Sequence, residues 1–513
     1  PHQAIEIIPT RHLSPRDVPR LLVVETAFPP DDRSLGYERG TSVSQAWAQA
    51  TTMVAIEVAG KIAARLDELA GIRDGRSDRD RRSGRDRRSG GERSEATDQP
   101  DRNERLRSFC RQFAERAFRR PLLDDEQRLF VAEQFEDAAG AADAETAVKR
   151  VVLRVLKSPR FLYREAGLGE FDAHARAAWM SYALWDSLPD APLREAAAAG
   201  ALATREQVAA QAERMLADPR TKAKLREFLH QWLNLDRFHD LSKDGELFPG
   251  FEEALTTDLR TSLDLFLDDV IWNGPSDFRQ LLLSDSLYAN GRLAKFYDLD
   301  LPDDAAFQKV SFEPDRRAGV LTHPYLLSGF AYHSTSSPIH RGVFVSRSVL
   351  GRFLKPPPEA VTPLAPDLHP DLTTRDRVEL QTKDTSCQRC HGLINPLGFP
   401  LEHFDAAGRY RNEEQDRPID ARGTYLNRAG ERIEFNAARE LATFLAASEE
   451  VHGAFVEQLF HGMMRQPVRA FGPDVLPRLE RSFAGNEFSV QRLLVEMVTE
   501  SALAAGDVLA AAR

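Results

Sequence analysis

The sequence predicts a mainly α-helical protein: a large multi-helix body with a cysteine-bearing segment, a proline-rich strap and one small β-hairpin. Three observations lead to this prediction. Apolar residues recur at helical spacing with few breaks from about residue 106 to residue 300. Hydrophobic residues make up 42% of the chain and charged residues 29%, so a sizeable core can form. Alternating residues on both sides of a turn mark Arg417–Phe435 as a hairpin.

Length and composition limit the class of protein. With 513 residues, the chain has room for about three to five domains, or one large helical body with an appendage. No stretch approaches the roughly 18–20 apolar residues that span a bilayer, so we expect no transmembrane segment. The net charge of -11 argues against nucleic acid as a partner. With 3 cysteines, a disulfide scaffold is excluded.

The first 106 residues divide into two parts. Residues 1–71 form an N-terminal helical segment, with apolar residues at helical spacing from Val43 to Leu69. Residues 72–106 break this pattern, and the hexapeptide RDRRSG occurs there twice in succession, from Arg79 to Gly90. We predict a disordered Arg/Asp-rich insertion. The alternative is an arginine-rich contact for an acidic polymer, but interleaved aspartates dilute its charge.

The central body is predicted to be helical, in two domains over residues 107–167 and 168–300. The predicted helices are Ser108–Phe118, Asp124–Gly140, Asp143–Leu156, Phe171–Asp186, Thr204–Leu216, Thr221–Leu235 and Glu252–Trp272. Three tryptophans, Trp179, Trp185 and Trp232, lie on the apolar faces of these helices. Each could stack on a ligand, but we expect them to fill the core.

Proline content changes the pattern after residue 300. Residues 301–416 form a segment that contains one helix, Gly342–Phe353, and a run of prolines over 356–370. Such a run favours an extended, semi-rigid strap across another surface. Residues 417–513 hold the hairpin, with strands at Gly423–Leu426 and Arg432–Phe435 around a turn at Asn427–Gly430. The closing helices are predicted at Glu440–Ala447, Val451–Met464 and Ser489–Leu503.

The pentapeptide Cys387-Gln-Arg-Cys390-His391 carries the most specific chemistry in the chain. Two thiols on one helical turn can add to the two vinyl groups of a haem, and the adjacent histidine can then ligate the iron. Half of a zinc site is an alternative, but the remaining thiol, Cys110, is far away in sequence. A thioredoxin-like pair is another, but no βαβ pattern surrounds the motif. We expect one covalently attached haem c with His391 as the proximal iron ligand.

The residues that follow the motif suit a haem crevice. Pro396, Leu397 and Phe399 are the candidates to line it, with Pro396 and Gly398 turning the chain around the haem edge. We expect a backbone carbonyl in this stretch to accept the Nδ1 proton of His391 and raise its basicity. Arg341 or Arg409 could pair with the haem propionates.

The sixth iron ligand is not defined by a motif. We predict His333 as the distal ligand because its segment is polar and irregular. The alternatives are an open or water-ligated iron or another side chain, namely His323, His340, Met463 or Met464; His403 and His461 are weaker candidates.

The stretch from Cys387 to Arg411, CQRCHGLINPLGFPLEHFDAAGRYR, resembles a signature of planctomycete-type secreted cytochrome proteins. These proteins are built from domain-of-unknown-function families 1587, 1595, 1592, 1588 and 1585. In that order, the families are similar to residues 12–66, 108–165, 168–300, 316–411 and 417–505 of this chain. The resemblance implies that Cys387, Cys390 and His391 bind haem, and that the chain is exported. Ser337-Pro338 and Arg341-Gly342 match a recurring motif of the same family.

Three functions remain open from the sequence. The first is a monohaem c-type cytochrome, periplasmic or secreted to the cell surface, that carries electrons between redox partners. Its partner would be a protein or a small electron donor or acceptor, and the acidic net charge favours a basic protein. The second is a haem enzyme of the peroxidase or oxidase type with an accessible distal position. The third is a cell-envelope binding or structural protein. Association with the cell envelope, or an oligomer, is open for the chain as a whole.

Overall fold

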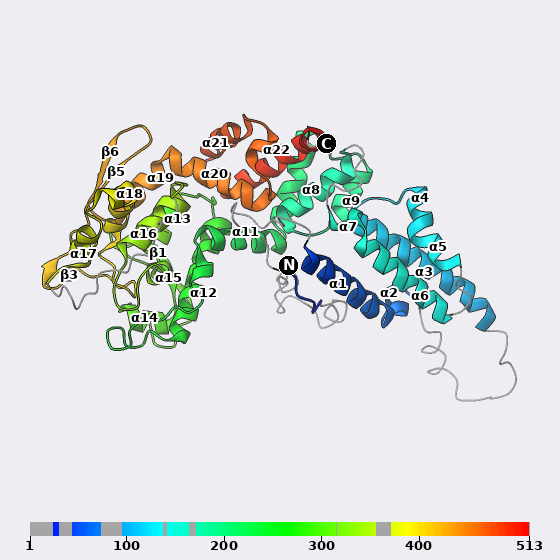
Figure 1. Cartoon of the computed structure of the whole chain (residues 1–513), viewed down its shortest axis with the longest axis horizontal. Helices are drawn as coiled ribbons and strands as arrows, with labels where there is room; N and C mark the ends of the chain where they lie inside the picture. Colours follow the sequence, from blue (N-terminus) through cyan, green and yellow to red (C-terminus); the bar gives the residue numbers. More distant parts are fainter. Residues whose placement is uncertain are drawn as a thin grey trace. The chain divides into compact units, whose positions relative to one another are not determined.

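The computed structural model describes residues 24–29, 44–72, 95–136, 141–163, 171–313, 315–354 and 371–511 (Figure 1). It is 63% helix and 6% strand, which confirms the mainly α-helical prediction. The chain divides into two compact units: unit 1 takes residues 1–223 and 498–513, and unit 2 takes residues 224–497. None of the described helices combines the length and apolar character needed to cross a membrane.

Unit 1 begins with a helical core built from distant parts of the sequence. The helices are α1 (Gln45–Ala63), α2 (Leu66–Leu69), α3 (Glu95–Phe118), α4 (Asp124–Gln127), α5 (Glu133–Glu136), α6 (Ala141–Lys157) and α7 (Pro159–Leu162), with a π-helical turn (Arg128–Ala132) between α4 and α5. Its interior includes Leu106, Cys110 and Val151, each fully buried. The predicted helix Asp124–Gly140 is therefore a helix interrupted by a π turn, and residues 137–140 lie outside the described part.

One boundary in this region corrects the sequence prediction. Helix α3 starts at Glu95, so residues 95–106 are helical, and the predicted disordered insertion ends earlier than expected. The apolar stripe of α3 begins only at Leu106, so the residues before it show no helical spacing in the sequence. Arg102 reaches Asp67 at 2.8 Å, which ties this part of α3 to α2. The repeat at Arg79–Gly90 lies outside the described residues.

The rest of unit 1 joins residues 171–223 to residues of the last helix. It contains α8 (Ala173–Trp185), α9 (Ala191–Ala198), α10 (Arg205–Leu216), the start of α11 (Pro219–Trp232) and the end of α22 (Val490–Ala511). Trp179 donates a hydrogen bond to Ser501 Oγ at 3.0 Å, and Arg176 donates to the Ala502 carbonyl at 3.1 Å. Trp179 and Trp185 are both buried, as expected of core residues.

The first half of unit 2 is helical with one small sheet. After α11 come a short 3₁₀ turn (Leu235–Arg237), α12 (Glu253–Trp272), α13 (Gln280–Leu283), β1 (Ser286–Ala289), α14 (Gly291–Tyr297), β2 (Gln308–Ser311), a second 3₁₀ turn (Gly319–Thr322) and α15 (Pro324–Gly329). Strands β1 and β2 are antiparallel, with Ser286 opposite Ser311. Trp232 is buried and donates to the Ser348 carbonyl at 2.7 Å, so it also belongs to the core.

The second half of unit 2 carries the cysteine motif. It contains α16 (Pro338–Phe344), a π-helical turn (Val345–Val349), α17 (Thr374–Gln381), α18 (Thr385–Gly398), a 3₁₀ turn (Phe399–Leu401), β3 (Glu413–Glu414), β4 (Arg417–Pro418), β5 (Gly423–Leu426), β6 (Arg432–Phe435), α19 (Ala438–Ala447), α20 (Glu449–Met464), a further 3₁₀ turn (Val468–Phe471) and α21 (Val475–Gly485). The proline-rich strap predicted at 356–370 lies outside the described residues.

Helices α16 and α18 cross with their backbones in contact. A Cβ atom added at Gly398 would stand 1.9 Å from the Pro338 carbonyl oxygen, and one at Gly342 would stand 2.0 Å from the Ile394 oxygen. Only glycine fits at these two positions, because any side chain would push the helices apart. The crossing explains why Gly342 and Pro338 belong together in the motif noted in the sequence.

The hairpin prediction is confirmed in place and register. Strand β5 pairs antiparallel with β6, with Gly423 opposite Phe435 and Leu426 opposite Arg432. The described residues contain three two-stranded sheets rather than one hairpin. The two sheets that were missed are β1–β2 and β3–β4. Strands β3 and β4 have two residues each, which is too short to show an alternating pattern, and β1 and β2 are separated by helix α14.

Candidate functional site

Helix α18 presents the cysteine motif on one side. Cys387, Cys390 and His391 are three and four residues apart along the helix, so their side chains share a face. Both cysteines are free thiols; Cys387 is half-buried and Cys390 is exposed. His391 is half-buried beside them. Two accessible thiols next to a histidine are the groups that covalent haem attachment requires, so these residues fit a c-type haem.

The His391 imidazole is held by a side chain and not by a backbone carbonyl, contrary to the sequence prediction. Its Nδ1 atom lies 2.9 Å from Oδ1 of Asn395, one helical turn further along α18. Asn395 is itself buried, and its Nδ2 atom donates to Thr382 Oγ1 at 2.9 Å. Neither Asn395 nor Thr382 was predicted as part of the site, although the four-residue spacing of His391 and Asn395 was a usable signal.

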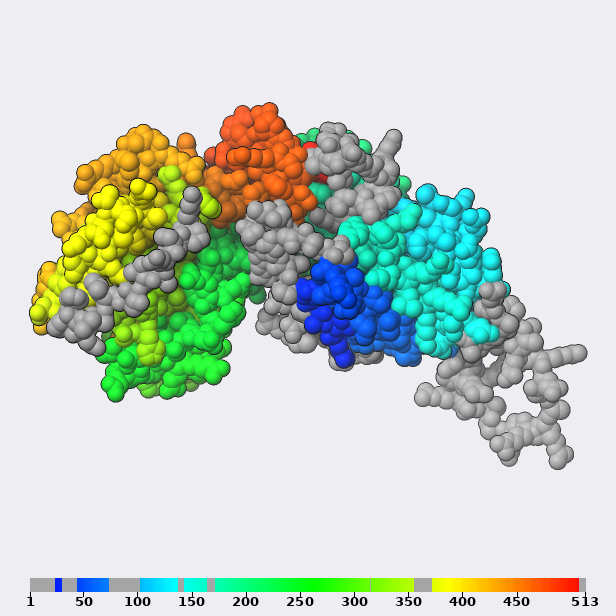
Figure 2. Space-filling model, in the orientation of Figure 1, coloured from blue at the N-terminus to red at the C-terminus, as the bar shows by residue number. Residues whose placement is uncertain are grey.

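A cavity of about 750 Å³ lies beside His391. This volume is within the roughly 300–1,000 Å³ of small-molecule and cofactor sites. It is lined from α17, α18, the hairpin and adjoining residues by Arg375, Glu379, Thr382, Lys383, Gln388, His391, Gly392, Asn395, Pro396, Phe399, Arg422, Gly423, Thr424, Arg432, Glu434, Phe435 and Asn436. These elements form a continuous yellow-to-orange surface of unit 2 (Figure 2). Neither thiol of the motif is part of this wall, so the cavity adjoins the shared face of α18 at its His391 edge.

The predicted crevice residues take different positions. Pro396 and Phe399 line the cavity, whereas Leu397 is fully buried and packs in the core. The prediction that the chain turns at Pro396 is wrong, because helix α18 continues to Gly398. Proline is tolerated there since it costs only one helical hydrogen bond, the one that the Gly392 carbonyl would accept, near the end of the helix. Gly423 of β5 closes the wall against the Pro396 carbonyl, where an added Cβ would stand at 2.0 Å.

Basic side chains dominate the charged part of the wall. The cavity is lined by four cations, Arg375, Lys383, Arg422 and Arg432, and by two carboxylates, Glu379 and Glu434. Arg375 stacks on the Phe399 ring at 4.2 Å and donates to Glu379 at 2.9 Å. Such a wall suits a ligand with carboxylate groups. Arg341 and Arg409, the sequence candidates for this role, are not part of the wall.

The candidates for the sixth iron ligand are also placed elsewhere. His333 is exposed, and its carbonyl accepts from the Asp244 amide at 3.1 Å. None of the sequence candidates belongs to the described wall of the cavity, namely His323, His333, His340, His403, His461, Met463 and Met464.

Two of these histidines, His323 and His340, are packed against other side chains of unit 2. His323 is buried between Ser262 and Tyr325, and burial lowers its pKa to about 3. Burial also lowers the pKa of His340, whose ring lies 5.0 Å from that of Tyr332. Met463 and Met464 are buried in α20.

A buried arginine organises the loop that follows α18. Arg341, 1% exposed, donates to the carbonyls of Leu401, Phe404 and Asp405 at 2.8, 2.7 and 2.8 Å. Its pKa is lowered to about 10 by burial. Arg409, the other sequence candidate for a propionate contact, instead pairs with Asp405 at 3.0 Å. Arg341 therefore supplies the hydrogen bonds that this loop cannot make within itself.

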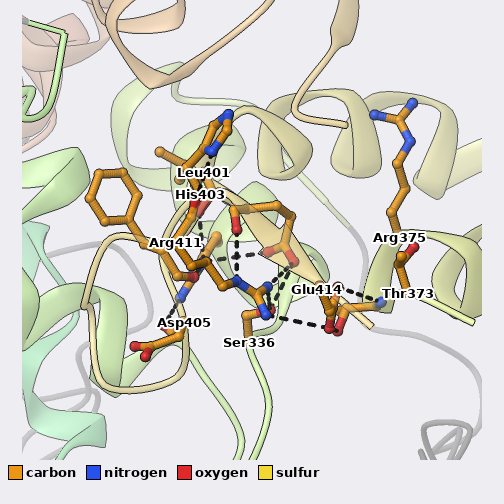
Figure 3. A network of polar contacts seen from close by, with 12 residues as sticks. Ser336, Thr373, Arg375, Leu401, His403, Asp405, Arg411 and Glu414 are labelled. Carbon is orange, nitrogen blue, oxygen red and sulfur yellow. Dashed lines mark hydrogen bonds and ion pairs between the residues drawn. The ribbon is translucent and has the colours of Figure 1, made fainter. Parts of the chain in front are cut away.

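Glu402 connects this arginine to a wider network, of which Figure 3 shows the part around Ser336, Arg411 and Glu414. Its carboxylate accepts from Ser336 at 2.8 Å and lies within 3.4 Å of both Arg341 and Arg411. Burial raises the pKa of Glu402, while the two guanidinium groups oppose that shift. Arg411 extends the network to Glu414 at 3.4 Å. The motif around residues 336–342 thus holds the loop that follows α18.

Other metal or thiol chemistry finds no support in the described part of the chain. No group of three or more His, Cys, Asp or Glu side chains there is arranged to hold a metal ion. Cys110 is fully buried in unit 1, and burial raises the pKa of its thiol to about 12. A thiol with so high a pKa is inert at neutral pH.

Three protein-family models match this chain. Residues 105–165 match PSD5, residues 171–299 match PSD4 and residues 317–414, which include the cysteine motif, match PSCyt3. Each is described as a protein of unknown function, under the designations DUF1595, DUF1592 and DUF1588, in that order. These matches support a relation to the planctomycete-type domain family, and the name PSCyt3 points to a cytochrome-like domain. No curated protein and no solved structure matches the chain.

Proposed function

We propose that this chain, with segments similar to PSD5, PSD4 and PSCyt3, is an exported monohaem c-type cytochrome that carries electrons between redox partners. The observation that carries the proposal is the surroundings of His391. It follows two accessible thiols on one face of α18, its Nδ1 atom is held by Asn395, and it lines a cavity of about 750 Å³. Export follows from the proposal because covalent haem attachment takes place outside the cytoplasm.

The residues of α18 would share the work of holding the group. Cys387 and Cys390 would form the thioether links, and His391 would bind the iron through Nε2. The haem would supply one-electron chemistry when bound. The four cationic side chains of the wall, Arg375 among them, would neutralise its carboxylates. Phe399 and Pro396 would exclude water from its edge and so lower the local dielectric.

A haem enzyme of the peroxidase or oxidase type is the second candidate. It is favoured by one observation: none of the histidines and methionines considered as distal ligands lines the described cavity wall. A polar wall without such a ligand leaves room for a small substrate or a water beside the iron position. The two functions differ in whether external ligands reach the iron.

The test is a spectrum of the full chain made in a host that attaches haem c. We expect one covalent haem by pyridine haemochrome and by intact mass. The variants C387A and C390A should each lose one thioether link, and H391A should keep the links but change the iron spectrum. The matched control is C110A, which removes a buried thiol of unit 1 and should leave haem content unchanged.

The same sample separates the two candidate functions. A low-spin iron that ignores carbon monoxide supports the electron carrier. Rapid carbon monoxide binding supports the enzyme, and peroxide and organic substrates should then be tried. Absence of covalent haem in the unmodified chain would overturn both and leave a helical binding protein.

A further inference from the structure

We propose that Asn395, held by Thr382, is a positioning residue for His391: it fixes the proton on Nδ1 and leaves the Nε2 lone pair available. The tautomer assignment stands on the hydrogen bonds alone. Its consequence for a reduction potential rests on the proposed function.

The carbonyl of Val378 sets the direction of the hydrogen bonds around Thr382. The backbone carbonyl of Val378 in α17 can only accept hydrogen bonds. The hydroxyl of Thr382, which follows α17, lies 2.7 Å from that carbonyl oxygen and must therefore donate to it. With its single proton used, Thr382 Oγ1 can only accept from its other neighbour.

The second step fixes the orientation of the Asn395 amide. One end of this amide lies 2.9 Å from Thr382 Oγ1. Since that oxygen must accept, the amide end that faces it must be the NH₂ group. The oxygen end then faces His391, at 2.9 Å from Nδ1. The opposite flip would place the amide oxygen against Thr382 Oγ1, whose proton is already donated to Val378, so two lone pairs would face each other.

The third step fixes the imidazole. Because Asn395 Oδ1 can only accept, Nδ1 of His391 must carry the proton. In a neutral imidazole the lone pair is then on Nε2. This is the form in which a histidine binds iron through Nε2, with its other nitrogen held by an outer partner.

Burial makes the arrangement stable. Thr382 is 3% and Asn395 is 5% exposed, so neither can exchange its partner for water at low cost. Gln388 also donates to the Thr382 carbonyl at 2.6 Å, which ties the segment between the two cysteines to the same residue. Thr382 thus anchors both Asn395 and the turn that holds the thiols.

The chemistry of Asn395 predicts how the iron would respond. A neutral amide oxygen is a weaker acceptor than a carboxylate, so it transfers less negative charge to the imidazole. N395D should give His391 more anionic character and favour the ferric state. Mutation of an outer partner typically changes metal affinity or activity by roughly 10–100-fold, and we expect the lower end of this range for the preference between the two iron states. A tenfold preference for ferric iron corresponds to a midpoint potential lower by about 59 mV for one electron.

Two readouts test the inference. In the full chain made without haem, ¹⁵N NMR of labelled histidine should show His391 as the Nδ1–H tautomer, identified by its loss in H391Q. T382V should shift it toward Nε2–H, because the amide is then free to flip. In the haem-loaded chain, N395D should lower the midpoint potential by about 59 mV.

Matched controls lie on the same cavity wall. N436D introduces the same charge without contact to His391, and T424V removes a hydroxyl from β5. Both should leave the tautomer unchanged, and N436D should move the potential less than N395D. In an N395L background, T382V should have no further effect.

Two results would overturn the inference: an Nε2–H tautomer in the unmodified chain, or equal potential shifts in N395D and N436D. If no covalent haem is attached, the proposed function fails. The NMR result still decides the tautomer.

Discussion

Replacing Gly398 by alanine tests the glycine crossing of α16 and α18. The Gly398 backbone has φ -92° and ψ -36°, a conformation that alanine adopts without strain. The effect of the change therefore comes only from the added Cβ, which would stand 1.9 Å from the Pro338 carbonyl oxygen and 2.7 Å from its carbon. Ordinary van der Waals contact begins at 3.4 Å, so one helix must withdraw by about 1.5 Å.

The structure sets the expected magnitude. Overpacking by one methyl group in a packed core costs about 1–3 kcal/mol. Here the obstacle is backbone and not the end of a flexible side chain, so the upper part of this range applies. Alanine gains at most about 1 kcal/mol over glycine in a helix. We expect G398A to destabilise unit 2 by about 2 kcal/mol.

Hydrogen exchange of the full chain measures this effect locally. Peptides over 338–344 and 385–398 should exchange faster in G398A by a factor of about 30, which corresponds to about 2 kcal/mol. The matched control is G392A on the same helix, where an added Cβ meets only Gln388 Oε1 at 3.8 Å. G392A should exchange as slowly as the unmodified chain, or more slowly. If the peptides of α16 and α18 exchange equally slowly in G398A and G392A, the close crossing of these helices does not depend on glycine at position 398.

Two further predictions concern buried charge. R341M should cost unit 2 about 3–5 kcal/mol in urea unfolding, because Glu402 and three loop carbonyls lose their donor; a loss below 1 kcal/mol would refute this role. Since burial lowers the pKa of His323 to about 3, the unfolded chain, with a pKa near 6.5, binds the proton first. Stability should therefore fall as the pH drops below about 6.5, by up to about 1.4 kcal/mol per unit from this group. H323Q should show a shallower slope between pH 6.5 and 4.5, and an unchanged slope would contradict the assignment.

Local patterns explain what could be predicted of the fold. The helical body follows from apolar spacing, which depends only on neighbours within two turns. The β5–β6 hairpin follows from the turn at Asn427–Gly430 and its flanking alternation. The start of α3 was missed because its first turns carry no apolar stripe, and a contact from Arg102 to Asp67 helps to hold them.

The site was predicted in part for the same reason. The cysteine spacing and His391 are local and were visible in the sequence. Thr382 was not, since its role depends on the way α17 meets α18. Arginine is frequent in this sequence, so Arg341 did not stand out. Only the path of the loop 401–405 shows that its side chain donates to backbone carbonyls. A side chain that hydrogen-bonds to backbone groups far away in sequence cannot be recognised from residue spacing.

The discontinuous make-up of unit 1 has a consequence for synthesis. Helix α8 donates hydrogen bonds to Ser501 and Ala502, and α10 forms an ion pair with Glu500; these three residues are made only after all of unit 2. At roughly 5–20 residues per second, the ribosome needs on the order of ten seconds to a minute to bridge this interval. Unit 2 is continuous in sequence and can finish first. Helices α8 and α10 must wait for the last segment, so a chain shortened before residue 498 would leave them without these contacts.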